Sequence, residues 1–316
     1  MTQNTDIIRQ VAHKYAETHM WWEWQIPVYL FLGGIVAGLM VLTSYRIVKG
    51  PDEERSLQFR LISWLVPVLL SLGMLALFLD LSNRLNVMRF YAAFIPTAPM
   101  SWGAWILIAV YPISILFALA ELPKGILESL KKNKIGTLVA GLSDWANDPV
   151  RKSRIAWFNL ALGVGIGIYT GVLLGNLAAR PLWNSAILGP LFLASGLSTG
   201  AAFMLLFGLS KKERHLIGRA DIVFITLELV LLSLFIITLL NGSTVQQEAV
   251  SLLMNNTYAV WFWSLVIIAG LLFPLAVEVV GYKRGRESRW VAPVMVLVGG
   301  FALRWILVFA GQTVSW

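Results

Sequence analysis

Polar residues that could do chemistry stand at the ends of long apolar runs in this chain. In the stretch WWEWQIPVYLFLGGIVAGLM, residues 21–40, Gln25 and Tyr29 are four positions apart, so one helix face carries both. The carboxylate of Asp80 closes the next apolar run. An amide, a phenol and a carboxylate together can donate hydrogen bonds, accept them and pass protons.

Further polar residues lie on the same side of other apolar runs. Arg304 stands about 10 Å inward from the end of the last run, by the helical rise, and Tyr169 comes to a similar depth. An ionisable group at membrane depth is costly unless it is partnered, so it marks a candidate functional site. A pocket with aromatic walls and a few hydrogen-bonding groups suits a quinone headgroup whose tail stays in lipid. The candidate set is Gln25, Tyr29, Asp80, Asn83, Arg84, Tyr169, Arg180, Asn184, Arg304 and Gln312.

Other interpretations of these residues stay open. Tryptophans at helix ends, such as Trp22 and Trp102, commonly form an interfacial belt. Asp80 can pair with Arg84, and Arg304 can belong to a structural ion pair. Convergence of polar groups from five apolar runs on one side favours a shared site.

The residue types that bind redox metals are scarce. The chain has no cysteine, which excludes iron–sulfur clusters, thiolate zinc and disulfides within it. Its three histidines, His13, His19 and His215, lie outside the apolar runs. Because a haem between membrane helices needs axial ligands inside them, we expect neither haem nor metal in this chain.

The amino-acid composition indicates the type of secondary structure that positions these residues. Hydrophobic residues make up 58% of 316, charged residues 13%, and mean hydropathy is +0.73. Runs of about 20 residues can cross a hydrocarbon core of about 30 Å, and their lack of alternation favours helices over a barrel. The sequence therefore predicts an all-α integral membrane protein with eight transmembrane helices, over 25–46, 61–80, 101–120, 155–175, 187–209, 220–241, 258–280 and 291–311.

Basic residues predict the orientation. Together with Arg46 at the end of the first predicted helix, the connections between predicted helices 1 and 2, 3 and 4, 5 and 6, and 7 and 8 hold 19 of the 25 lysines and arginines. Cytoplasmic loops carry this excess, so both termini are predicted on the periplasmic side of a bacterial or archaeal cytoplasmic membrane. The net charge of +8 then faces anionic lipid and needs no nucleic-acid partner.

The predicted organisation has an amphipathic N-terminal segment, 1–24, and a membrane domain, 25–316. The connection 121–154 alternates apolar and basic positions at helical spacing, which indicates an interfacial cytoplasmic helix. Two four-helix halves, about 25–175 and 176–316, are suggested by small-residue patterns in their opening helices, at Gly34 and Gly38 and at Gly196 and Gly200. Close helix packing explains these glycines without a duplication.

Three carboxylates lie deeper or towards the cytoplasmic side: Glu228, Glu121 and Glu278. One hypothesis makes them a proton route from the cytoplasm to the site. The other makes them packing partners for hydroxyl groups and water. The sequence leaves both open.

Several motifs resemble those of the NrfD family, the membrane subunits of polysulfide reductase and related respiratory complexes. WEWQIPVYLFLGGIVAG is similar to the family's first-helix signature, and YTGVLLGNLAARPLWN with LFLASGLSTGAA is similar to the signature of its fourth and fifth helices. GGFALRWILVFAGQ resembles the closing helix. LDLSNR resembles an Asp-Leu-x-x-Arg pattern after the second helix, with Asn or Leu where the family often has proline beside the arginine.

The resemblance implies an eight-helix subunit without haem that binds menaquinone or ubiquinone near its outer face. It also implies a docked ferredoxin-like iron–sulfur subunit, together with a molybdenum or tungsten pterin subunit or a multihaem cytochrome. In a family member, a tyrosine matching Tyr169 lines the quinone pocket, and a histidine stands where this chain has Tyr29. A phenol can donate the same hydrogen bond but is a poorer proton relay at neutral pH.

The predicted function is therefore a quinone-reactive subunit of an anaerobic respiratory oxidoreductase, not catalytic alone. Tyr169, Arg304 and Asp80 are the predicted catalytic residues, and the other seven residues of the outer set bind the quinone. A secondary transporter and a purely structural membrane anchor are the rival hypotheses. The sequence contains no helix-interrupting Gly/Pro pairs at matching midplane positions, which a transporter would favour.

Overall fold

The computed structural model describes residues 22–50, 55–81, 84, 91–92, 95, 97–131, 134–177, 179–284 and 290–314. Within these ranges the regular structure is entirely helical. Eight helices are long and apolar enough to cross a membrane, which confirms the predicted number of spans. The prediction for 1–24 lies almost wholly outside the described residues.

The chain forms its helices in a simple order. The elements are α2 (Gln25–Lys49), α3 (Leu57–Asp80), α5 (Pro99–Ala120), α6 (Lys124–Leu130), α7 (Lys134–Ala146), α8 (Pro149–Gly175), α9 (Leu188–Leu205), α10 (Lys211–Leu240), α11 (Thr244–Met254), α12 (Ala259–Trp261), the π-helix η2 (Phe262–Leu272), α13 (Phe273–Arg284) and α14 (Val291–Thr313). The seventh span is composite, because α12, η2 and α13 follow one another without a break.

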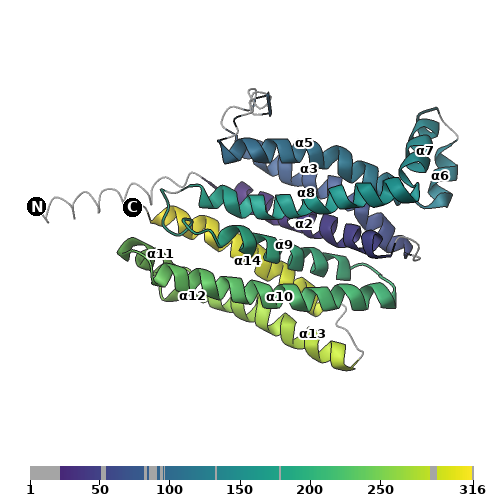
Figure 1. Cartoon of the computed structure of the whole chain (residues 1–316). Coiled ribbons are helices and arrows are strands. Elements are labelled where there is room, and N and C mark those ends of the chain that lie inside the picture. Colours follow the sequence, from purple (N-terminus) through teal and green to yellow (C-terminus); the bar gives the residue numbers. More distant parts are fainter. Residues whose placement is uncertain are drawn as a thin grey trace, which may run out of the picture.

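The spans form two groups that meet along α2 and α9. Figure 1 shows α2, α3, α5 and α8 on one side and α9, α10, α13 and α14 on the other. At the junction Gly38 of α2 approaches Gly196 and Gly200 of α9 so closely that a methyl group on Gly38 would meet the backbone of both. The two glycine pairs seen in the sequence therefore pack against each other, as small residues do between membrane helices. The predicted duplication stays a prediction.

Several helices begin earlier than their apolar runs. The predicted helix 220–241 starts at Lys211, because the Ser210 hydroxyl accepts the amide of Glu213 and the Glu213 carboxylate accepts the amide of Ser210. This capping box holds a basic turn in helical form beyond the hydrophobic run. Likewise α8 starts at Pro149, after the Asp148 cap, and not at 155.

Short helices lie across the ends of the bundle. In the predicted interfacial connection 121–154 the chain forms α6 and α7, which lie across one end, and α11, which the sequence did not predict, lies at the other (Figure 1). The Ser143 hydroxyl of α7 donates to the Leu119 carbonyl in the last turn of α5, at 2.7 Å. The short helices therefore rest on the span ends.

The start of α2 and the end of α14 lie at the same end of the bundle. The side-chain amide of Gln312 accepts the Trp22 amide at 2.9 Å and donates to the Trp22 carbonyl at 3.0 Å. Because the first and last spans have their outer chain ends at the same end of the bundle, the chain crosses the bundle an even number of times. The side of the membrane that this end faces stays a prediction.

Candidate functional site

A cavity of about 610 Å³ lies at the end of the bundle that holds Trp22. The first turns of α2 and α5 and the last turns of α3 and α8 supply its walls. Most lining side chains are apolar, and the polar ones are Ser71, Asp80 and the tyrosines Tyr29, Tyr91 and Tyr169. The volume lies within the range of small-molecule sites in proteins.

Two buried tyrosines, Tyr29 and Tyr169, face this cavity from α2 and α8. Tyr29 lies close enough to Tyr169 and Tyr91 to interact with both electrostatically. Gly103 of α5 makes room for Tyr169, because a methyl group at Gly103 would overlap the phenol ring and hydroxyl. The sequence interpretation named Tyr29 and Tyr169 but not Gly103 or Tyr91.

Asp80 is the last residue of α3 and lines the cavity near the acidic side chain of Glu23. The alternative interpretation was an ion pair between Asp80 and Arg84, and the described residues do not form it. The Arg84 guanidinium donates to the Leu79 carbonyl at 2.9 Å and lies over the Phe78 ring. Asp80 is thus a half-buried carboxylate that lines the cavity and is not paired with Arg84 in the described part of the chain.

The cavity opens to the outside of the bundle at side chains of α3 and α5. Leu75 and Met100 line it, and they are also 53% and 52% exposed on the outside of the bundle. An apolar ligand longer than the cavity can therefore extend out of it beside these helices.

Trp22 lines the cavity at this end of the bundle and is held by contacts with distant segments. Its ring stacks on Trp183 at 5.3 Å between centroids, and the Trp183 indole donates to the Leu307 carbonyl at 2.8 Å. Gln312 binds the Trp22 backbone, and the Arg180 guanidinium donates to the Gln312 carbonyl at 2.7 Å. Gln312 and Arg180 therefore position Trp22 and are not among the described lining residues.

Three further predicted ligands, Asn184, Arg84 and Gln25, are not among the described residues that line the cavity. Asn184 and Arg84 are exposed, and Asn83 lies outside the described residues. Gln25 is half-buried, and its side-chain oxygen has no hydrogen-bond partner among the described residues. A buried amide oxygen without a hydrogen-bond partner costs free energy. The side-chain oxygen of Gln25 can therefore accept a hydrogen bond from a ligand or a partner.

Arg304 lies one layer behind the cavity wall. Only 1% exposed, it donates to the Leu30 carbonyl at 3.1 Å, the Ser195 hydroxyl at 3.1 Å and the Gly300 carbonyl at 2.7 Å. Leu30 lines the cavity, so Arg304 holds the wall and does not touch the interior among the described contacts.

Buried carboxyl groups continue from Arg304 along α10. Glu228 bonds to the Ser195 hydroxyl and interacts with the charge of Arg304. Two turns away, Asp221 accepts the Ser198 hydroxyl at 3.1 Å, and its carboxyl group interacts electrostatically with that of Glu278 on α13.

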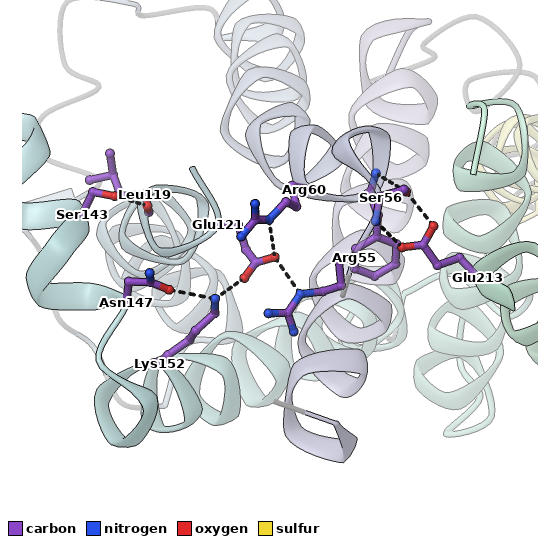
Figure 2. Close-up of polar contacts among 10 residues, drawn as sticks. Arg55, Ser56, Arg60, Leu119, Glu121, Ser143, Asn147, Lys152 and Glu213 are labelled. Carbon is purple, nitrogen blue, oxygen red and sulfur yellow. Dashed lines mark hydrogen bonds and ion pairs between the residues drawn. The ribbon is translucent and has the colours of Figure 1, made fainter. Parts of the chain in front are cut away.

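This arrangement brings together two of the three predicted inner carboxylates. Glu228 and Glu278 belong to the buried series, and Asp221, which the sequence interpretation missed, lies between them. Asp221 could have been noticed in the sequence because it lies at the start of the predicted helix 220–241. Glu121 is elsewhere, bound to Lys152 at 2.6 Å and Arg55 at 3.1 Å (Figure 2).

No group of three or more histidine, cysteine or acidic side chains that could hold a metal occurs in the described part of the chain. The chemistry available at the cavity is hydrogen bonding and proton exchange with an apolar ligand.

The fold and cavity define a multi-pass helical membrane protein with an apolar pocket at one end. Residues 13–315 match the family model described as polysulphide reductase, NrfD, and the chain belongs to this family. The C subunit of polysulfide reductase from Wolinella succinogenes is 32% identical over 307 residues, covering 92% of this chain and 94% of the relative. Protein NrfD of Escherichia coli is 30% identical over 307 residues, covering 92% and 95%.

A more distant relative is the Hdr-like menaquinol oxidoreductase integral membrane subunit of Archaeoglobus fulgidus. It is 23% identical over 304 residues, covering 91% of this chain and 69% of the relative. The family and these relatives support a membrane subunit of an oxidoreductase complex.

Proposed function

We propose that this chain is the quinone-reactive subunit of a respiratory oxidoreductase complex. The observation that carries the proposal is the cavity whose apolar walls hold Tyr29, Tyr169 and Asp80 and open between α3 and α5. Its volume accommodates a ring-sized headgroup, and its lipid-facing opening accommodates an isoprenoid tail. The quinone, menaquinone or ubiquinone, supplies two-electron, two-proton redox chemistry when bound.

The chain's own residues have distinct roles. The hydroxyl groups of Tyr29 and Tyr169 donate hydrogen bonds to the ligand's oxygen atoms, because phenols are the donors that reach the cavity from α2 and α8. Asp80 exchanges protons with the aqueous side. Trp22 excludes water, and Arg304 fixes the Leu30 backbone behind the wall.

Electrons must come from or go to a partner, because the chain has no cysteine and no redox metal is expected in it. We propose a ferredoxin-like iron–sulfur subunit docked on the end that holds Trp22, on the periplasmic side. A molybdenum or tungsten pterin subunit, or a multihaem cytochrome, would complete the complex.

The test is quinol turnover by the assembled complex carrying Tyr169→Phe. Loss of one hydrogen bond to a ligand atom that gains charge costs about 1.5–3 kcal/mol, so turnover should fall roughly 10- to 100-fold. Tyr45→Phe is the matched control, because this tyrosine of α2 is exposed near the opposite end of the helix. Unchanged turnover in Tyr169→Phe with a fully assembled complex would contradict the proposal.

A second function, proton transfer across the membrane, is favoured by the buried series from Arg304 through Glu228 to Asp221 and Glu278. Hydroxyl groups of Ser195 and Ser198 join it to α9. Glu228→Gln should lower the proton-to-electron ratio in liposomes while quinol turnover continues. An unaltered ratio would leave these groups as structural partners.

The rival functions are tested by purification. A secondary transporter would be isolated without an iron–sulfur partner after mild detergent extraction, and a structural anchor would assemble normally but show no turnover change on substitution of Tyr169.

A further inference from the structure

A pair of hydroxyl groups lies at the opening of the cavity. Ser71 of α3 lines the cavity and is also exposed on the outside of the bundle. Its hydroxyl group lies 3.2 Å from the hydroxyl group of Tyr111 on α5. Leu75, one helical turn from Ser71, borders the opening on the same face of α3. The pair therefore joins α3 to α5 where the cavity opens.

Ser71 lies far from the ends of its span. By the helical rise it stands about 14 Å inward from Asp80, the last residue of α3. This depth is close to the middle of a hydrocarbon core of ~30 Å. A lipid phosphate is charged and does not enter that core, because the loss of its hydration costs too much free energy. A polar group that reaches Ser71 through the membrane therefore belongs to an uncharged headgroup.

The direction of each hydrogen bond in the pair follows from the number of hydrogen atoms. The serine hydroxyl has one hydrogen, which it donates to the Pro67 carbonyl at 2.7 Å. The contact between Ser71 and Tyr111 therefore has the Tyr111 hydroxyl as its donor. Both hydroxyl hydrogens are engaged, whereas each oxygen atom still has a lone pair that can accept a hydrogen bond.

The pair thus offers acceptors to a ligand, whereas the phenols of Tyr29 and Tyr169 offer donors. A quinol carries two hydroxyl groups, and each can donate to the oxygen of Ser71. A quinone carries carbonyl groups, which only accept. A carbonyl group placed beside Ser71 would face an acceptor, or it would take the Tyr111 hydrogen and break the bond between the two hydroxyl groups.

We propose that Ser71, with Tyr111 behind it, is an acceptor site at the cavity opening that binds a hydroxyl group of the reduced ligand, a quinol, in preference to the oxidised quinone. This inference rests on the proposed quinone function and adds selectivity for one redox form to it.

A bond that only holds α3 against α5 is the alternative, because hydrogen bonds between membrane helices stabilise their packing. A structural bond would affect the two redox forms of the ligand equally. Ser233 of α10 provides a matched control. It is exposed like Ser71 and donates to the carbonyl four residues earlier, that of Leu229, at 2.8 Å. It is not among the described residues that line the cavity.

The test measures the dissociation constants of dimethylnaphthoquinol and dimethylnaphthoquinone on the full chain in lipid nanodiscs, in the absence of oxygen. Ser71→Ala removes the acceptor oxygen, so the quinol should bind roughly 3- to 10-fold more weakly. The same change releases the Tyr111 hydroxyl to donate to a carbonyl group, so the quinone should bind more tightly by a similar factor. Ser233→Ala should leave both constants unchanged.

A second variant separates the two effects. In a Tyr111→Phe background the released donor is missing, so Ser71→Ala should still weaken binding of the quinol but should leave binding of the quinone unchanged. Equal weakening of both redox forms by Ser71→Ala would indicate a structural bond and overturn the proposal. Unchanged binding of the quinol in Ser71→Ala would also overturn it.

The same measurement distinguishes this inference from the proposed function. If both redox forms bind the wild-type chain and Tyr169→Phe weakens them, but Ser71→Ala changes neither, only the acceptor site is overturned. If neither form binds the wild-type chain, the proposed function is overturned together with the acceptor site.

Discussion

Gly103 offers a test of whether the position of the Tyr169 hydroxyl matters for turnover. In Gly103→Ala one methyl group is added where the Tyr169 ring and hydroxyl lie. Carbon atoms in contact stay about 3.5–4.0 Å apart, so the phenol must move by more than ~1 Å. Because a displacement of about 1 Å can cost roughly 100-fold in rate, quinol turnover should fall roughly 10- to 100-fold.

The assay is quinol oxidation or quinone reduction by the assembled complex, with the amount of complex measured separately. Gly165→Ala in α8 is the matched control, because nothing lies within 4 Å of a methyl group there. In a Tyr169→Ala background the ring is gone, and Gly103→Ala should then have no further effect. Normal turnover in Gly103→Ala, or an equal loss with and without the Tyr169 ring, would refute the reasoning.

Three further predictions concern assembly and stability. Gly200→Val should abolish accumulation of the folded chain, because Gly38 lies against this backbone, whereas Gly208→Val, which has open space, should accumulate normally in membranes. Glu121→Gln should lower the unfolding free energy by about 3 kcal/mol, since it leaves buried cations without their carboxylate, while Asp144→Asn at an exposed pair should change it by less than about 1 kcal/mol in denaturant titrations. Gln312→Ala should release Trp22 and increase its fluorescence quenching by a water-soluble quencher; an unchanged quenching constant would show that the amide does not hold the ring.

The sequence predicts at which end of a membrane helix a residue lies. It does not predict the direction in which the side chain points around the helix axis. The bilayer requires apolar runs of fixed length, so all eight spans were found, and Tyr29, Tyr169 and Asp80 were assigned to one end, where they line one cavity. Lipid and the protein core are both apolar, however, so a membrane helix carries little amphipathic signal for its buried face. Arg304 was therefore assigned to the site, but it lies behind the cavity wall and donates to the Leu30 carbonyl.

Other residues escaped prediction for a related reason. Gly103 and Tyr91 become relevant only when α5 and the segment before it meet α8, and one sequence does not show which helices are neighbours. Asp221 is ordinary at the margin of a membrane span and becomes unusual only through its proximity to the carboxyl group of Glu278. The starts of α8 and α10 depended on caps at Asp148 and Ser210, which lie outside the hydrophobic runs.

The shared carboxylate of Glu213 has a consequence for biosynthesis. It accepts the amide and hydroxyl of Ser56 as well as those of Ser210, so it completes the beginnings of two helices whose caps are far apart in the chain. Ser56 and Glu213 are 157 residues apart, which a ribosome covers in roughly 8–30 s. During that interval the second span already crosses the bilayer while its first turn lacks this partner. The contact between the second and sixth spans can therefore form only after the first turn of α10 has been synthesised.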